Sequence, residues 1–350
     1  PMLLGCLLFV ACSDDDIAEK GVKEGLPASL TFKMVVPDLN DAVVTRAGVE
    51  QETALNQLMF LFYKKSDTSK PAFARVIDQL GQYSIGSDSE DESNRLYTVT
   101  ISPGDTDSNG NELKSGEYYL YALANWHNGF CSYDAEGYAS KSLDELKNAI
   151  LARESGANVL DIVNNTPMTG IYGRNDGSIT INEGKNSFGT TDETRVHLRR
   201  AVAKVIFNIS TENGITFTPE RYSIYNYSQS STLMERSGWE GGQGTKPGNL
   251  SYEGNNSFSD FENLAFSDNT PNSFEFYMPE NVQKTKEVFT EVKMREKRVS
   301  KTNETFKYAP ENSTYIVIEG HYNGPRNASD KTATYDGDVK YTIQLGDFNA

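Results

Sequence analysis

Alternation of apolar and polar positions predicts a β-strand near the start of the chain. In the segment 29–36 every second residue is apolar, and Thr31, Lys33 and Val35 fill the positions between. Successive side chains of a strand point to opposite faces of its sheet, so a period of two indicates a strand with one buried face. The residues on the expected buried face are Leu30, Phe32, Met34 and Val36.

Two later segments are apolar at consecutive positions. They read LMFLFY over 58–63 and YYLYALA over 118–124. A strand that is apolar on both faces is typical of the middle of a layered β structure. Further along, Ser142 stands three residues before Glu145, at the start of an apolar helical pattern. This is the spacing of a capping box, and it predicts one short helix.

The second half repeats the pattern of short apolar strands separated by Gly, Asn, Asp and Ser. A change in the parity of the apolar positions near Arg199 and Arg200 indicates a β-bulge or a passage from one domain to the next. Many short strands with turn residues between them favour an all-β chain. We expect two sandwich domains, over 29–194 and 195–350, with the short helix in the first. The strand patterns that follow the parity change lie at 222–227, 274–278, 314–320 and 339–345.

The first residues predict export. Residues 2–11 form an uncharged apolar run of signal-peptide length that is too short to span a bilayer. Small residues and then Cys12 follow it, and the next positions are acidic. This arrangement resembles a bacterial lipoprotein signal, in which Cys12 becomes the lipidated first residue of an outer-membrane precursor. We therefore expect a signal peptide over 1–12 and a polar tether over 13–28. The alternative is a secreted protein with a coincidental cysteine.

Composition and charge exclude several classes of protein. The 350 residues are 37% hydrophobic, which is enough for a core and unlike a disordered chain. The formal net charge of −16 argues against a protein that binds nucleic acid through a basic face. Cys6 lies in the expected signal peptide and Cys12 carries lipid, so only Cys131 remains. A single cysteine forms no internal disulfide, and stability must come from the core.

Several short motifs, in a characteristic order, resemble the Bacteroidales fimbrillin family of fimbrial subunits. The resemblance covers nearly the whole chain and is carried by order and spacing, because each motif is short. The motifs are Thr45-Arg46-Ala47, LNQLMFLFY (55–63), YYLYALANW (118–126), VHLRRAVAKVIF (196–207), FEFYMPENV (274–282), TYIVIEGHY (314–322) and YTIQLGDFN (341–349).

The fimbrillin resemblance implies a fold and a mechanism of assembly. The fold would be two tandem transthyretin-like Greek-key β-sandwiches. An arginine-specific protease would cut after Arg46, leaving Ala47 as the new N-terminus, and the segment 29–46 would depart. Leu30, Phe32, Met34 and Val36 would thus plug a groove that a strand of another subunit later fills. The implied partners are other fimbrial subunits in a head-to-tail polymer on the cell surface, together with an adhesion ligand that the sequence does not identify.

The chain also departs from the fimbrillin pattern at its end. Fimbrillins continue past the strand that matches YTIQLGDFN, and the donor strand lies in that continuation, whereas this chain stops at Ala350. The charged start of a signal peptide is missing as well. We expect either that the sequence is a fragment or that the donor end is absent.

One loop has part of a calcium-binding pattern. Asp105, Asp107 and Asn109 precede a glycine, as in the first half of an EF-hand loop, but Gly116 stands where the bidentate glutamate is needed. A polar hairpin turn is the favoured interpretation. The three histidines lie in separate segments and no nucleophile with a base stands out, so we expect neither an enzyme nor a cofactor.

Two other functions remain open from the sequence. The first is a fimbrial anchor, in which Cys12 stays lipidated and Arg46 is not cut. The second is a surface glycan-binding lipoprotein, in which Trp126 or Trp239 would stack on a sugar. A tryptophan that follows a buried strand is more often part of a core.

Overall fold

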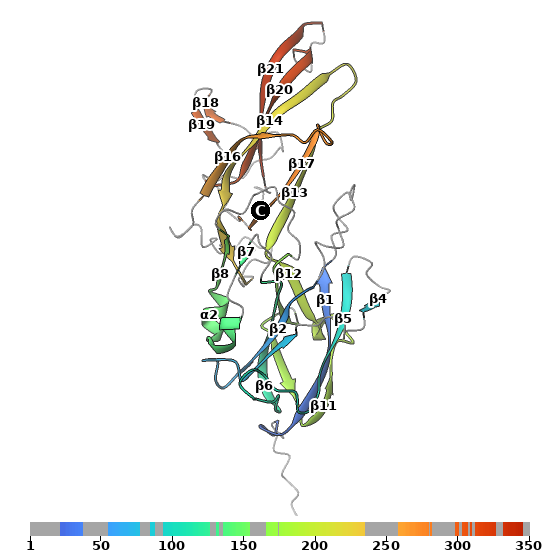
Figure 1. Ribbon diagram of the computed structural model, residues 1–350, viewed down its shortest axis with the longest axis vertical. Coiled ribbons are helices and arrows are strands. Elements are labelled where there is room, and N and C mark those ends of the chain that lie inside the picture. Colours follow the sequence, from blue (N-terminus) through green and yellow to red (C-terminus); the bar gives the residue numbers. More distant parts are fainter. Residues whose placement is uncertain are drawn as a thin grey trace, which may run out of the picture.

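Most of the described residues lie in strands, as expected for an all-β protein. The computed structural model describes residues 22–37, 55–77, 85–87, 94–126, 131–132, 136–154, 166–173, 175–234, 258–279, 281, 298–300, 303–306, 309, 312–326 and 332–345. Figure 1 shows two β regions arranged along the long axis of the molecule, with β1, β2, β5 and β6 in one and β14, β16, β20 and β21 in the other.

The first region is built on a ten-stranded sheet with the path β3-β2-β6-β9-β12-β1-β5-β4, to which β10 and β11 are attached through β6 and β1. Its strands are β1 (Ala28–Pro37), β2 (Leu58–Lys64), β3 (Phe73–Ile77), β4 (Ile85–Ser87), β5 (Asn94–Ile101), β6 (Gly116–Ala124), β9 (Met168–Tyr172), β10 (Ser178–Ile181), β11 (Gly184–Ser187) and β12 (Val196–Arg200). Phe32 of β1 contacts Phe60 of β2 although three strands separate β1 from β2 along the path. The sheet must therefore curl back on itself to enclose a core.

The second region contains a four-stranded sheet, β16-β14-β20-β21, and the pair β13–β17. The bounds are β13 (Val202–Asn208), β14 (Thr216–Ser228), β16 (Phe258–Ala265), β17 (Ser273–Pro279), β18 (Arg298–Ser300), β19 (Asn303–Phe306), β20 (Tyr315–Pro325) and β21 (Thr334–Gln344). Among these, β18 and β19 pair only with each other in the described part of the chain.

A small sheet joins the two regions. Its strands are β7 (Cys131–Ser132), β8 (Ile150–Arg153) and β15 (Ser230–Thr232), in the order β15-β8-β7. The helical elements are η2 (Glu136–Ser140), α2 (Leu143–Lys147) and η3 (Asp192–Thr194). The capping box of α2 is present, because Ser142 Oγ accepts from the Glu145 backbone N–H and the Glu145 carboxylate accepts from the Ser142 backbone N–H. Within the described ranges, no helix is long and apolar enough to cross a membrane.

Strand β2 separates two apolar cores, which explains why its sequence is apolar at every position. Leu58, Phe60 and Phe62 face the core inside the curled sheet. Met59, Leu61 and Tyr63 face a second core, which includes Leu143 and Leu146 of α2. This second core continues into the other β region through Tyr222, Ile224, Phe276, Ile316 and Ile318.

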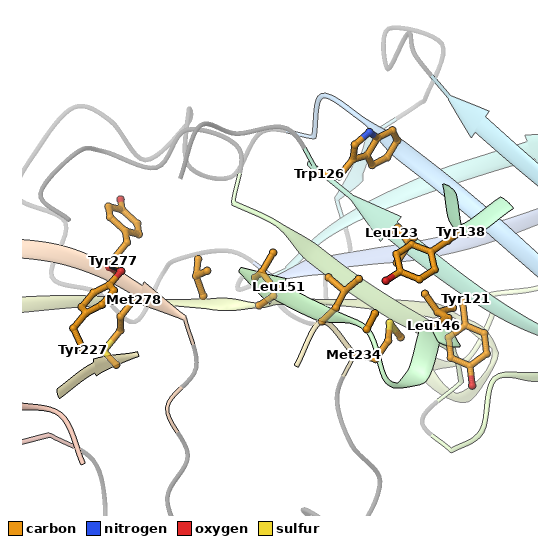
Figure 2. Close-up of a cluster of buried hydrophobic side chains, with 14 of the residues drawn as sticks. Tyr121, Leu123, Trp126, Tyr138, Leu146, Leu151, Tyr227, Met234, Tyr277 and Met278 are labelled. Carbon is orange, nitrogen blue, oxygen red and sulfur yellow. Dashed lines mark hydrogen bonds between the residues drawn. The ribbon is translucent and has the colours of Figure 1, made fainter. Parts of the chain in front are cut away.

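The second core links the two β regions. In Figure 2, Leu151 of β8 lies between Tyr227 and Tyr277 on one side and Tyr138 and Leu146 on the other. Tyr227 donates to the backbone carbonyl of Tyr277 at 2.7 Å. The two β regions thus share buried side chains as well as the backbone pairing of β8 with β15.

The domain boundary expected from the sequence does not coincide with the position at which the chain leaves the first sheet. The sequence interpretation started the second domain at residue 195, but β12 (Val196–Arg200) pairs with β1 and β9 in the first sheet. The chain enters the second region at Ala201, directly after the parity change at Arg199 and Arg200. Whether the two regions fold as separate domains stays a prediction.

Gly170 of β9 lies at a close approach of two backbones. A Cβ added there would lie 2.2 Å from the carbonyl oxygen of His197 in β12. No rotamer relieves a contact between Cβ and backbone, so the strands must separate. We expect Gly170→Ala to lower the free energy of unfolding by about 1–3 kcal/mol, measured by urea denaturation. The exposed Thr180→Ala in β10 should change it by no more than about 0.5 kcal/mol, and equal effects would contradict this packing.

Candidate functional site

The strand expected to be removable, β1, lies inside the first sheet with a neighbour on each side. It pairs antiparallel with β5 from Leu30↔Ile101 to Pro37↔Asn94. On its other side it pairs parallel with β11 over its first half and with β12 at Met34 and Val35. Both edges of β1 are therefore hydrogen-bonded by the chain itself.

The apolar parity of β1 lies in the core as the sequence predicts, and Val35 on the opposite parity is also buried. Thr31 and Lys33 on the opposite parity are half-buried. Phe32 packs edge-to-face on Phe60, with ring centroids 4.9 Å apart and an interplanar angle of 87°. The residues that are 0% exposed are Leu30, Phe32, Met34 and Val36. The expected plug residues thus sit together in the core of the curled sheet.

A short segment before β1 is held against the start of β6. The backbone of Ser115 accepts from Gly25 N at 2.9 Å and donates to the carbonyl of Leu26 at 2.8 Å. Its buried hydroxyl accepts from Leu26 N at 3.0 Å and donates to the carbonyl of Lys23 at 2.5 Å. These contacts fix where β1 enters the sheet.

The segment around β11 covers the middle of β1. Phe188 N donates to the Thr31 carbonyl at 2.9 Å, and the Asn186 side-chain amide donates to the Ser29 carbonyl at 3.1 Å. Gly189 has a φ of +102°, and a Cβ there would lie 2.8 Å from the backbone nitrogen of Lys33. Only glycine fits this close approach to β1 without moving a strand.

Two tyrosines in the core around β1 are uncharged at neutral pH. Burial, with a smaller effect from the charge of Glu24, raises the pKa of Tyr118 to about 12. Burial also raises the pKa of Tyr172. Both phenols belong to the core that encloses β1, so that core presents an apolar, neutral surface to the strand.

If β1 left, the sheet would open at a position between paired strands. The backbone groups of β5 on one side and of β11 and β12 on the other would lose their partners, and buried apolar side chains would meet water. Four apolar side chains at about 2 kcal/mol each give on the order of 8 kcal/mol of gross burial as an upper estimate. Such an opening has the chemistry to accept an added strand through main-chain hydrogen bonds and alternate side chains.

The other sequence-predicted residues divide into two groups. Cys12, Arg46 and Ala47 lie outside the described residues, as does Trp239. Trp126 is buried in the second core, as is common for a tryptophan that follows a buried strand, and it is not placed to stack on a sugar.

The weak calcium candidate forms a turn with its own hydrogen bonds. Asp107 accepts from the backbone N–H groups of Asn109 and Asn111 at 2.9 and 2.8 Å, and Asp105 accepts from Ser102 N at 2.8 Å. The guanidinium of Arg75 lies 3.9 Å from Asp105. Within the described ranges, no group of three or more His, Cys, Asp or Glu side chains could hold a metal ion.

Sequence reasoning missed the role of Asn125, which follows β6. This residue is buried, has a φ of +57°, and accepts from Asn56 N at 2.9 Å just before β2. Its amide also donates to the Thr166 carbonyl at 3.1 Å. Asn125 therefore joins the ends of three segments at the point where the chain returns to β2. An asparagine after a buried strand is the signal that could have indicated it, because asparagine tolerates positive φ.

The chain is similar to one protein family over part of its length and to solved structures over most of it. A family described as a domain of unknown function (DUF4906) matches residues 276–350, which include β20 and β21. The search of curated proteins found no match. Among solved structures, the chain is similar to a candidate cell adhesion protein from Parabacteroides distasonis, with 17% identity, a TM-score of 0.47 and coverage of 91% of this chain and 80% of that one. A fimbrial assembly protein from the same organism has 11% identity and a TM-score of 0.41, with coverage of 91% and 86%.

Proposed function

We propose that the chain is a fimbrial subunit that is exported as a lipoprotein, cut after Arg46, and polymerised at the cell surface by exchange of β1 for a strand of another subunit. The observation that supports this most is the position of β1. It is an inner strand with one fully buried face, yet the chain that follows it contains Arg46 before β2 begins at Leu58. A cut there breaks the covalent link between β1 and the later strands of its sheet.

Cleavage supplies the step that makes exchange possible. While the chain is intact, β1 is held next to its own groove at a high effective concentration, and a strand from outside competes poorly. After cleavage the same contacts join two separate molecules, and the strand that leaves is diluted. A strand tethered to a neighbouring subunit then fills the groove, and because the two joined surfaces differ, the contact repeats as an open polymer. Lipidation at Cys12 and adhesion to another surface complete the proposal.

Uptake of a strand tests this function without needing the donor end. The uncut chain is treated with an arginine-specific protease and then mixed with a fluorescent peptide of residues 28–37. We expect the cut chain to lose the segment that ends at Arg46 and to bind the peptide, because the peptide restores both ladders. Fluorescence polarisation measures the binding, and mass spectrometry locates the cut.

Two controls make the result specific. An Arg46→Ala chain should resist the cut and not take up the peptide. A peptide with Phe32→Asp should bind at least about a hundredfold more weakly, since it would bury a charge in the apolar core. Retention of the β1 segment after cleavage, or equal binding of both peptides, would contradict the proposal. The mass of the surface form separates the anchor alternative, since a polymerising subunit begins at Ala47 and an anchor at lipidated Cys12.

A further inference from the structure

The ends of β14, β20 and β21 form a three-stranded projection, which we call the distal ribbon and define as residues 216–219, 320–325 and 334–341. Figure 1 shows β20 and β21 reaching one end of the long axis, at the pole opposite to β6 and β11. The register pairs Phe217 with Tyr322, and Tyr322 with Gly337. The distal ribbon therefore has two faces, set by the parity of each strand.

One face of the distal ribbon is charged, and its charges are paired. His321 lies between two carboxylates, with Nε2 2.7 Å from Asp336 and Nδ1 3.0 Å from Asp338. At the base of this face, Glu319 forms ion pairs with Arg221 and, at 3.3 Å, with Lys340. This pattern is typical of a solvated face.

The other face is aromatic and rich in glycine. It continues the apolar face of the same sheet, whose lower part is buried in the second core. Two of the four large hydrophobic side chains that are exposed in the described residues lie on it, Tyr335 at 40% and Tyr341 at 44%. The residues of this aromatic face are Phe217, Gly320, Tyr322, Gly324, Tyr335, Gly337, Val339 and Tyr341.

Two tyrosines of the aromatic face are held flat along the sheet in the same way, each by a hydrogen bond from its hydroxyl and by a glycine beneath its ring. Tyr322 Oη donates to the Pro325 carbonyl at 2.8 Å, and a Cβ on Gly324 would lie 2.8 Å from Tyr322 Oη. Tyr335 Oη donates to the Asp338 carbonyl at 3.0 Å, and a Cβ on Gly337 would lie 2.9 Å from Tyr335 Oη. Each ring thus lies over the glycine two residues ahead. In this position Tyr335 remains exposed.

A third ring is held by edge contact. Tyr341 packs edge-to-face on Phe217, with centroids 5.4 Å apart and an interplanar angle of 88°. The Phe217 ring in turn lies over Gly320, where a Cβ would be 2.9 Å from a ring carbon. Rings fixed in this way lose little conformational freedom when a ligand binds.

The size and charge of the aromatic face favour one kind of occupant. An aromatic side chain has about 150–250 Å² of surface, so the exposed parts of Tyr335 and Tyr341 amount to on the order of 200 Å². A stable protein interface needs about 800 Å² from each partner, and the exposed parts of these two side chains supply about a quarter of it. A pyranose ring presents a flat group of C–H bonds of phenol size, with partial positive charge that suits the negative face of an aromatic ring.

We propose that the aromatic face of the distal ribbon binds a neutral glycan by stacking sugar rings on Tyr335 and Tyr341. The charged side chains of the ribbon lie on its opposite face, so this face offers an acidic or basic ligand no ion pair from the ribbon. The site is remote from β1 and uses none of its residues. It therefore does not depend on cleavage or strand exchange, and the uncut chain is sufficient to test it.

The test uses four neutral hexasaccharides as probes: cellohexaose, maltohexaose, mannohexaose and chitohexaose. Isothermal titration calorimetry of the uncut chain should show saturable binding of at least one, with a dissociation constant of about 1 mM or lower. We expect Tyr335→Ala and Tyr341→Ala each to weaken it about tenfold. Tyr341→Phe keeps the ring and its edge contact with Phe217, and Lys340→Ala lies on the charged face, so both should bind within about twofold of the original chain.

A second measurement does not depend on the folding of any variant. Saturation-transfer NMR on the original chain should show transfer to the C–H protons of one sugar face. Absence of saturable binding for all four probes, or equal affinity of the alanine variants, would overturn the proposal. Self-association that both alanine substitutions abolish would also overturn it, since a second copy would then be the occupant. Peptide uptake at the β1 groove is unaffected by any of these results.

Discussion

Replacing Phe32 with alanine is expected to lower the free energy of unfolding of the uncut chain by about 3–5 kcal/mol. The side chain is fully buried, meets Phe60 edge-to-face, and belongs to the core inside the curled sheet. Neighbouring strands are paired on both sides of β1, so they cannot close over the cavity without breaking a ladder. Urea denaturation followed by circular dichroism measures the change.

The matched control for Phe32 lies next to it on the same strand. Thr31→Ala removes a half-buried side chain from the other parity and a contact of 3.2 Å between the hydroxyls of Thr31 and Thr100. We expect a loss of about 1 kcal/mol or less there. If Phe32→Ala cost no more than this control, β1 would not support the core, and the idea that it plugs a groove would fail. After cleavage, the Phe32→Ala segment should also leave the groove faster than the original one.

Asn125→Ala should lower the free energy of unfolding by about 3 kcal/mol. The substitution removes the acceptor that lies 2.9 Å from the part-buried backbone N–H of Asn56, and it removes the amide that donates to the buried Thr166 carbonyl. Loss of a hydrogen bond costs about 1–3 kcal/mol at a buried group and less at a part-buried one. Alanine also tolerates a φ of +57° less well than asparagine does. Thermal and urea unfolding both report the change.

Two further substitutions separate the causes at Asn125. Asn125→Gly relieves the backbone strain but makes no side-chain hydrogen bond, so it should be nearly as destabilising as alanine. Asn125→Asp keeps an acceptor for Asn56 and loses the donor to Thr166. An aspartate variant less stable than the alanine variant would show that burying the charge costs more than the retained acceptor contributes.

Where periodicity was strong, the sequence was a good guide to the elements. The alternation over 29–36 predicted β1 (Ala28–Pro37). The two-sided run over 58–63 predicted a strand in the middle of a layered structure, and β2 lies between two cores. The spacing of Ser142 and Glu145 predicted the start of α2. These features depend on contacts within a few residues or on one face of one strand, and so they are visible in sequence alone.

The sequence did not show which strands pair with one another, because such pairing joins residues far apart in the chain. The parity change at Arg199 and Arg200 was visible, but pairing with β1 and β9 assigns β12 to the first sheet, and parity carries no information about the partner strand. Strand β21 begins at Thr334 rather than at 339, because the polar residues at its start pair with β20 across the distal ribbon. The position of β1 between β5 and β12 was likewise inaccessible without the fold.

The direction of β1 has a mechanical consequence. In Figure 1 this strand runs along the long axis of the molecule, and its ladder with β5 comprises eight consecutive residue pairs. Ladder hydrogen bonds lie across the strands, so a pull along the axis loads them in shear, and all eight pairs must yield together. In the polymer proposed above, a strand seated in this slot would resist tension along the filament much better than peeling from one end, and such a fibre would be strongest in the direction in which flow stretches it.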